Sequence, residues 1–167
     1  MIYSFWIFDK HCNCIFEREW TLGSNTNNPN ALSSGTINSK QNDEIGKLLY
    51  GMIFSLNSIT QKLSTSISDN QINNNIRSIS TGKFRIHTMQ TATGLWFILI
   101  TDFKQQNYSQ VLHYIYSHIY IKHVVHNFLS PYDFALNPKE QRGQGVKKIN
   151  NRHFINTLEA FLQSMLN

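Results

Sequence analysis

Two short segments of this chain are apolar on both of their alternating faces, and they constrain the fold more than any other feature. The segments are IYSFWIF at 2–8 and LWFILI at 95–100. A strand with apolar side chains on both faces has to be covered on both sides of its sheet. The sequence therefore predicts a sheet with two central strands, held between two layers of helices.

Three further segments carry weaker strand patterns, at 14–20, 76–81 and 83–91. The first follows a polar turn, alternates Ile15 with Glu17 and Glu19, and is predicted to be an edge strand in a hairpin with residues 2–8. A turn at Gly94, which can take a positive φ, joins the third segment to the strand at 95–101. The expected sheet has five strands.

Three segments show the three-and-four spacing of amphipathic helices, at 43–66, 108–127 and 152–166. In the longest, Asn42 and the acidic residues after it favour a helix start. Its apolar stripe is predicted to face the sheet, and consists of Ile45, Leu48, Leu49, Met52, Leu56, Ile59 and Leu63. The order of elements is thus ββαβββαα.

With the long helix on one face and the two later helices on the other, this order gives an α/β/α sandwich around a five-stranded antiparallel sheet. The longin or profilin-like architecture has this arrangement, an analogy of fold that carries no function by itself. The chain has 167 residues and 41% hydrophobic residues, enough for one compact domain over 1–167. An Asn/Ser-rich stretch at 23–41 is predicted to be a mobile loop, and 132–151 an irregular stretch without an assigned role.

Charge gives little information about partners. The net charge is +5, but the basic residues are scattered, and the one loose cluster comprises Arg142, Lys147, Lys148 and Arg152. We interpret this cluster as a solvated loop and helix start; the alternative is a weak contact with an anionic membrane or an acidic partner. No segment has the roughly 20 apolar residues of a membrane span, and the N-terminus does not resemble a signal peptide, so we expect a soluble intracellular protein.

Neither metal binding nor catalysis is predicted. The chain has seven histidines, of which His123 and His126 stand three apart, but no nearby acidic residue completes a zinc site. Cys12 and Cys14 match neither a zinc nor a redox spacing, and we expect ordinary thiols at a hairpin. No nucleophile elbow or phosphate-binding loop is present, which favours a protein without catalytic residues, cofactors or metal ions.

Aromatic side chains instead suggest a partner-binding protein. A single domain need not bury all of them, and tyrosine and tryptophan are enriched at protein interfaces, although core packing is the alternative for each one. The candidate interface residues are Trp20, Tyr50, Phe54, Tyr116 and Tyr120.

Several motifs, in the same order along the chain, carry a family resemblance. They are Glu19-Trp20, LLYGMIFS at 48–55, FRIH at 84–87, TATGL at 91–95, Thr101-Asp102, VLHYIY at 111–116 and YIKHVVHN at 120–127. The chain resembles the subunit 1 family of the transport protein particle (TRAPP), except that Ala92 and Phe128 stand where that family often has proline.

The resemblance implies a longin-fold core subunit without catalysis of its own. Such a subunit contributes to a tethering complex that acts as nucleotide exchange factor for an early-secretory Rab GTPase in transport from the endoplasmic reticulum to the Golgi. The implied partners are a second longin subunit, α/β-type subunits and, through the complex, the GTPase; membrane contact occurs only as part of the complex. The implied location is cytoplasmic, peripheral at endoplasmic reticulum and cis-Golgi membranes.

Other functions remain open from the sequence alone. The main alternative is a longin-type subunit of another trafficking assembly, such as a clathrin-adaptor small chain. A SNARE longin protein would need a heptad helix, a ligand-binding sensor would need a polar-lined pocket, and an enzyme is the least favoured.

Gly51 lies inside the long helix and is predicted to sit where a neighbouring backbone packs closely, so that Gly51→Leu would disrupt folding or assembly.

Overall fold

The computed structural model describes residues 1–20, 35–39, 42–67, 75–104, 108–131, 134 and 147–166. The predicted order of strands and helices is confirmed, and each predicted boundary is met within a few residues. The elements are β1 (Ile2–Phe8), β2 (Cys14–Glu19), α1 (Asn42–Ile67), β3 (Ser78–Ser80), β4 (Phe84–Gln90), β5 (Trp96–Asp102), α2 (Ser109–Tyr114), η1 (Ile115–Val125) and α3 (Arg152–Leu166).

The five strands form one antiparallel sheet in the order β2-β1-β5-β4-β3. The two segments that are apolar on both faces, β1 and β5, are its central strands and pair directly, with Trp6 opposite Ile98 and Ile7 opposite Phe97. At the turn into β5, Gly94 has a φ of 84°, which agrees with the turn predicted there.

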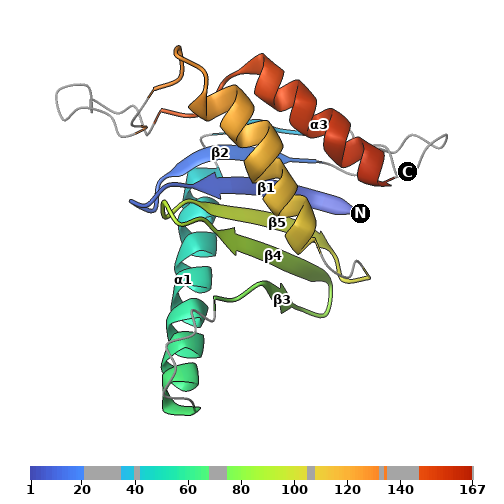
Figure 1. The fold of residues 1–167 in the computed structure, drawn as a ribbon. Coiled ribbons are helices and arrows are strands. Elements are labelled where there is room, and N and C mark those ends of the chain that lie inside the picture. The colour runs from blue at the N-terminus through green and yellow to red at the C-terminus, as the bar shows by residue number, and fades with distance from the viewer. Residues whose placement is uncertain are drawn as a thin grey trace.

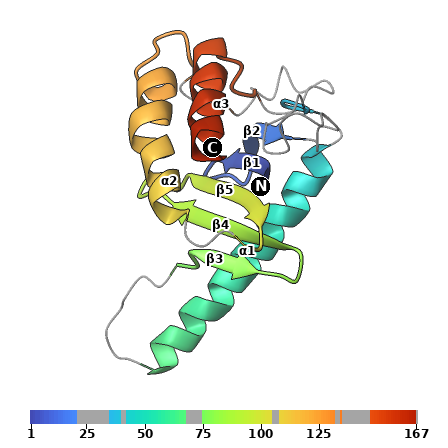
Figure 2. The ribbon, with the colours of Figure 1, turned by 90° about the vertical axis from the view of Figure 1, so that its right-hand side faces the viewer.

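Helices cover both faces of the sheet, as predicted. Figures 1 and 2 show α1 crossing the strands on one face, while α2, η1 and α3 lie together on the other. The core beneath the later helices is built from aromatic rings in edge-to-face contact, such as Phe16 with Phe154 and Phe97 with Tyr120, whose ring centroids are 5.1 Å and 5.4 Å apart. The α/β/α sandwich is confirmed.

The side of α1 that faces the sheet is not the predicted one. Its buried positions are Gly46, Ile53 and Asn57, with Leu49 and Tyr50 half-buried beside them. These residues pack against the face of the sheet that carries Trp6, Phe8, Ile86, Trp96 and Ile98. The predicted apolar stripe is turned away, because five of its seven residues are exposed: Ile45, Leu48, Met52, Ile59 and Leu63.

A close approach of the sheet explains this rotation. A Cβ atom at Gly46 would lie 3.1 Å from Cζ3 of Trp6, so only glycine lets the helix pack against this indole ring without displacing it. Gly51 has the opposite environment, since an added Cβ would meet nothing within 4 Å. The prediction of a closely packed backbone at Gly51 is therefore wrong for the chain by itself, and Gly46 is the glycine that packing requires.

The outer edge of β2 is covered, although β2 is the predicted edge strand. Residues 35–39, expected to belong to the mobile loop, run beside it: the amide of Glu19 donates to the carbonyl of Thr36, and the amide of Asn38 donates to the carbonyl of Glu17. The amide of Ile149 donates to the carbonyl of Ile15. Glu17 is consequently fully buried, whereas Glu19 is exposed.

The second predicted helix changes its geometry along its length. It begins as α2 and continues as the π-helix η1, in which each amide donates to the carbonyl five residues earlier instead of four. The buried residues of η1 follow this wider period and are Ile115, Ile119, Tyr120 and Val124. Apolar spacing predicted a helix here, but it did not predict the π geometry.

The remaining predictions concern the loops. Residues 23–34, 40–41, 132–133 and 135–146 lie outside the described residues, so most of the predicted loop and of the irregular stretch is untested. Before α3, the side chain of Asn151 accepts a hydrogen bond from the amide of His153 and caps the helix. Within the described residues, no helix combines the length and the apolar character that crossing a bilayer requires.

Candidate partner-binding surface

The most prominent surface feature is the apolar flank of α1, here named the α1 stripe and defined as Ile45, Leu48, Met52, Ile59 and Leu63. Their exposed fractions are 55%, 76%, 41%, 53% and 58%. At about 100° per residue, all five point into an arc of about 60°. Contiguous exposed apolar surface of this kind marks interaction sites more often than isolated exposed residues do.

The length and placement of α1 make this stripe accessible. The helix has 26 residues, which corresponds to about 39 Å, and Figure 2 shows it running beyond β3 at the edge of the sheet. Its packing against the sheet depends on a short inner row around Ile53, with Asn57 at its end accepting a hydrogen bond from the amide of Ile76. The stripe is therefore presented by a helix whose position is already fixed by other residues.

The five aromatic residues predicted as interface anchors do not form one surface. Tyr50 and Phe54 stack on α1 with centroids 6.2 Å apart, whereas Tyr116 and Tyr120 lie on η1, on the opposite face of the sheet. Trp20 follows β2 and is buried, as is Tyr120, so the exposure assumed for these two is absent. Phe54 is exposed, and Tyr50 and Tyr116 are half-buried. Their role at an interface stays a prediction.

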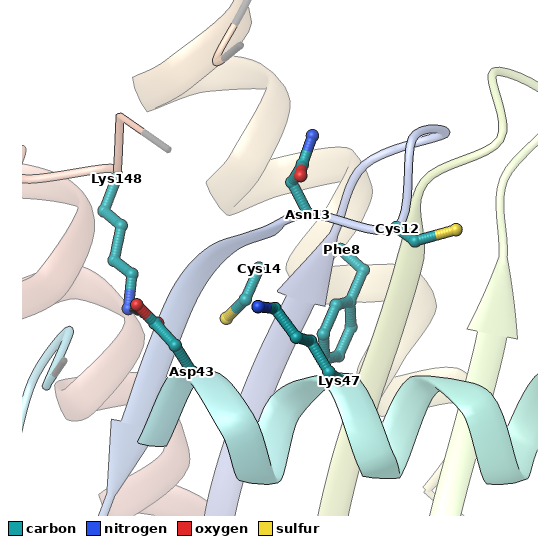
Figure 3. A pocket seen from close by; sticks show the side chains of 7 residues that line it. All are labelled: Phe8, Cys12, Asn13, Cys14, Asp43, Lys47 and Lys148. Carbon is teal, nitrogen blue, oxygen red and sulfur yellow. Dashed lines mark hydrogen bonds and ion pairs between the residues drawn. The ribbon is translucent and has the colours of Figure 1, made fainter. Parts of the chain in front are cut away.

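A small cleft of about 190 Å³ lies between the start of α1 and the hairpin of β1 and β2 (Figure 3). It contains two lysines and two cysteines, and two of these residues, Lys148 and Cys14, are in states that do not suit catalysis. Lys148 is paired with Asp43, with 2.5 Å between Nζ and Oδ1. Burial raises the pKa of the Cys14 thiol to about 12, so that it stays protonated and is a poor nucleophile. Cys12 points away from the other lining residues.

Two buried titratable groups elsewhere have structural partners. Nε2 of His87 lies 3.0 Å from Oγ1 of Thr101 inside the sheet, and burial lowers the pKa of His87 to about 4. Burial raises the pKa of Glu17, partly offset by a hydrogen bond from Asn42 and by the charge of Lys148. In the described ranges, no three histidine, cysteine, aspartate or glutamate side chains are close enough together to hold a metal ion.

Two exposed apolar features were not predicted from the sequence: the α1 stripe, and the adjacent pair Phe128 and Leu129, which are 104% and 93% exposed. Helical spacing correctly identified the stripe as one face of a helix. It could not show which face the sheet covers, because the inner row of α1 contains glycine and asparagine beside Ile53. Gly46 in that row was the feature of the sequence that could have indicated which side of α1 packs against the sheet.

Comparison with known proteins identifies the family of this chain and relatives that are named as subunits of a particle. Residues 2–139 match the family described as Sybindin-like. The chain is 67% identical to the trafficking protein particle complex subunit BET5 of Saccharomyces cerevisiae, over 99% of this chain and 98% of that protein. It is 29% identical to the transport protein particle subunit bet5 of Schizosaccharomyces pombe, over 98% and 97%, and 28% identical to the human trafficking protein particle complex subunit 1, over 78% and 79%.

Proposed function

Since this chain belongs to the Sybindin-like family, we propose that it is a non-catalytic core subunit of a TRAPP tethering complex. The α1 stripe is the observation that carries the proposal. A chain that works alone gains nothing from five exposed apolar side chains along one helix, whereas a subunit buries them against a neighbour.

The proposed activity belongs to the assembled complex. In it, the chain pairs with a second longin subunit and with α/β-type subunits and contributes to a platform that releases nucleotide from an early-secretory Rab GTPase. The subunit names of the relatives support membership of the particle. We further propose that it acts in transport from the endoplasmic reticulum to the Golgi, in the cytoplasm at the surface of these membranes.

The test is to purify the full-length tagged chain from its native cells and identify the proteins that co-purify. We expect other longin and α/β-type subunits, together with Rab nucleotide release that the chain alone does not produce. Recovery of clathrin-adaptor subunits, or of the chain without partners, would reject the proposed complex and leave the fold unaffected.

A pair of variants connects the result to the surface. Leu48→Ser with Ile59→Ser removes two members of the α1 stripe, and we expect recovery of partners to fall about tenfold or more, because each buried interface anchor contributes about 1 kcal/mol or more. The matched control is Phe103→Ser with Met165→Ser, which removes two other exposed apolar side chains, 48% and 46% exposed, outside the stripe. Equal losses in both variants would contradict the role of the stripe.

A further inference from the structure

The end of η1 carries a second exposed apolar group, here named the apolar tip and defined as Val125, Phe128 and Leu129. Phe128 and Leu129 are almost completely exposed, and Val125 is 59% exposed. The turn is internally hydrogen-bonded: Oδ1 of Asn127 accepts from the amide of Leu129, and the carbonyl of Asn127 accepts from the amide of Ser130. The loop is thereby held with two neighbouring large side chains directed outward.

Basic side chains lie around this tip. A cleft of about 500 Å³ separates it from the turn between β1 and β2, and Lys10 and His11 line the same cleft as Val125 and Phe128. Figure 1 places this turn and the end of η1 at the same end of the sheet. Lys122 and His126 are both exposed. Lys122 lies three residues before Val125, and His126 directly follows Val125. Lys10 therefore places a cation across the cleft from the tip, and Lys122 lies close to the tip in sequence.

The carboxylate among the described lining residues of this cleft is Asp9, and it is buried. Asp9 is 7% exposed, and its side chain accepts hydrogen bonds from the amides of His11 and Asn13, both at 2.8 Å, and from the side chain of Asn13. Its oxygen atoms are directed into the β1–β2 turn by these three bonds. Among the described lining residues of the cleft, the exposed charged side chain is therefore Lys10.

We propose that the apolar tip is a contact site for a bilayer with anionic headgroups. Phenylalanine and leucine on a protruding turn insert into the boundary between headgroups and acyl chains, and lysine is attracted to the negative surface within a Debye length. The two requirements, apolar insertion and positive charge, occur together at this one place. The proposal extends the proposed function and rests on it, because the proposed function places the complex beside a membrane.

A lipid surface fits these observations better than a protein partner does. Protein interfaces are enriched in aromatic residues and arginine and depleted in lysine, and leucine is rare among their strongest anchors, whereas the tip presents leucine and phenylalanine with lysine nearby. The contact is small, so the free chain binds vesicles weakly, and an assembled complex with several contacts binds them more tightly.

The experiment measures flotation of the purified full-length chain, and of its complex with co-purified partners, with lipid vesicles. Vesicles of phosphatidylcholine are compared with vesicles of phosphatidylcholine and phosphatidylserine. We expect tighter binding to the anionic vesicles than to the neutral ones. Phe128→Ser combined with Leu129→Ser should weaken binding to anionic vesicles about tenfold or more. Lys10→Ala combined with Lys122→Ala should also weaken it, and added salt should weaken the binding of the unmodified chain in the same way.

Control variants separate this inference from the proposed function. Leu48→Ser with Ile59→Ser should lose partners but keep vesicle binding by the free chain, whereas the tip variant should keep partners and lose vesicles. Circular dichroism is expected to show both variants folded, since all four side chains are exposed. The inference is overturned if neither the chain nor the complex binds anionic vesicles, if the tip variant binds them like the unmodified chain, or if the tip variant loses a protein partner and keeps vesicle binding.

Discussion

Lys148 and Asp43 form an ion pair across 105 residues of sequence, with 2.5 Å between Nζ and Oδ1. The same ammonium group lies 4.0 Å from Oε2 of the buried Glu17 and donates to the carbonyl of Ser39 at 3.4 Å. One side chain from the segment before α3 therefore connects the start of α1, the strand β2 and the segment that covers its edge. The basic cluster interpreted from the sequence as solvated thus contains a residue with a structural role.

Replacement of Lys148 by methionine should lower the free energy of unfolding by about 1–3 kcal/mol, because it leaves the carboxylate of Glu17 buried without its cation. Urea unfolding of the purified chain measures the change. The neighbouring Lys147 is exposed, and Lys147→Met should stay within about 0.5 kcal/mol of the unmodified chain. Equal effects of the two variants would contradict this role of Lys148.

Stability should fall in mild acid because of His87. Burial, with a smaller effect of the Arg85 cation, lowers the pKa of His87 from 6.5 to about 4, so the folded chain holds a neutral imidazole. Below about pH 6.5 the unfolded chain binds a proton that the folded chain does not, so this contribution is complete above pH 6.5 and is lost as the pH falls towards 4. The loss amounts to about 3 kcal/mol.

Chemical denaturation near about pH 7 and about pH 4.5 provides the comparison for His87. In His87→Gln the difference between the two pH values should shrink, because the titrating ring is gone. His126→Gln, at an exposed position, should leave it unchanged. A pH difference that is the same in all three chains would assign the acid sensitivity to other groups.

The orientation of α1 can be tested with two isoleucines on the same helix. Ile53 is 1% exposed and Ile59 is 53% exposed. Ile53→Ala should lower the free energy of unfolding by about 2–4 kcal/mol through lost burial and a cavity, whereas Ile59→Ala should cost less than about 1 kcal/mol in the isolated chain. Thermal and urea unfolding both report the difference. The opposite ranking would mean that the α1 stripe faces the sheet after all.

Two glycines of α1 should respond in opposite ways to alanine. Gly51→Ala should raise the free energy of unfolding by about 0.5–1 kcal/mol, because alanine favours a helix and the added methyl meets nothing. At Gly46 the methyl would approach Cζ3 of Trp6 to 3.1 Å, so Gly46→Ala should be at least about 1 kcal/mol less stable than Gly51→Ala. Melting temperatures of the two proteins give the ranking, and equal values would argue against the close approach at Trp6.

Local patterns in the sequence predicted the elements and the layers because these depend on local properties. The apolar character of both faces of β1 and β5 requires cover on both sides, and a turn with a positive φ at Gly94 follows from the position of glycine between two strands. The arrangement of helices on the two faces then follows from chain order. No partner, distant segment or unusual helix geometry enters these inferences.

The predictions that failed depend on contacts between distant residues. Periodicity assigned the most apolar side of α1 to the sheet, but the fit of Gly46 against Trp6 decides the rotation, and the most apolar side remains exposed. The alternation of Ile15 with Glu17 and Glu19 predicted an edge strand, because nothing local indicates that residues 35–39 and Lys148 cover Glu17. Hydrophobicity alone does not distinguish a core from an interface.

The covered edge of β2 also limits how this chain can aggregate. Growth of a sheet into a fibre requires that each copy offers two open edges, one to accept a neighbour and one to template the next. Here Thr36, Asn38 and Ile149 already occupy the backbone groups of β2, and within the described residues the opposite edge is the three-residue strand β3. Strand pairing between copies would therefore stop at a closed pair instead of propagating, which protects a subunit while its partners are absent.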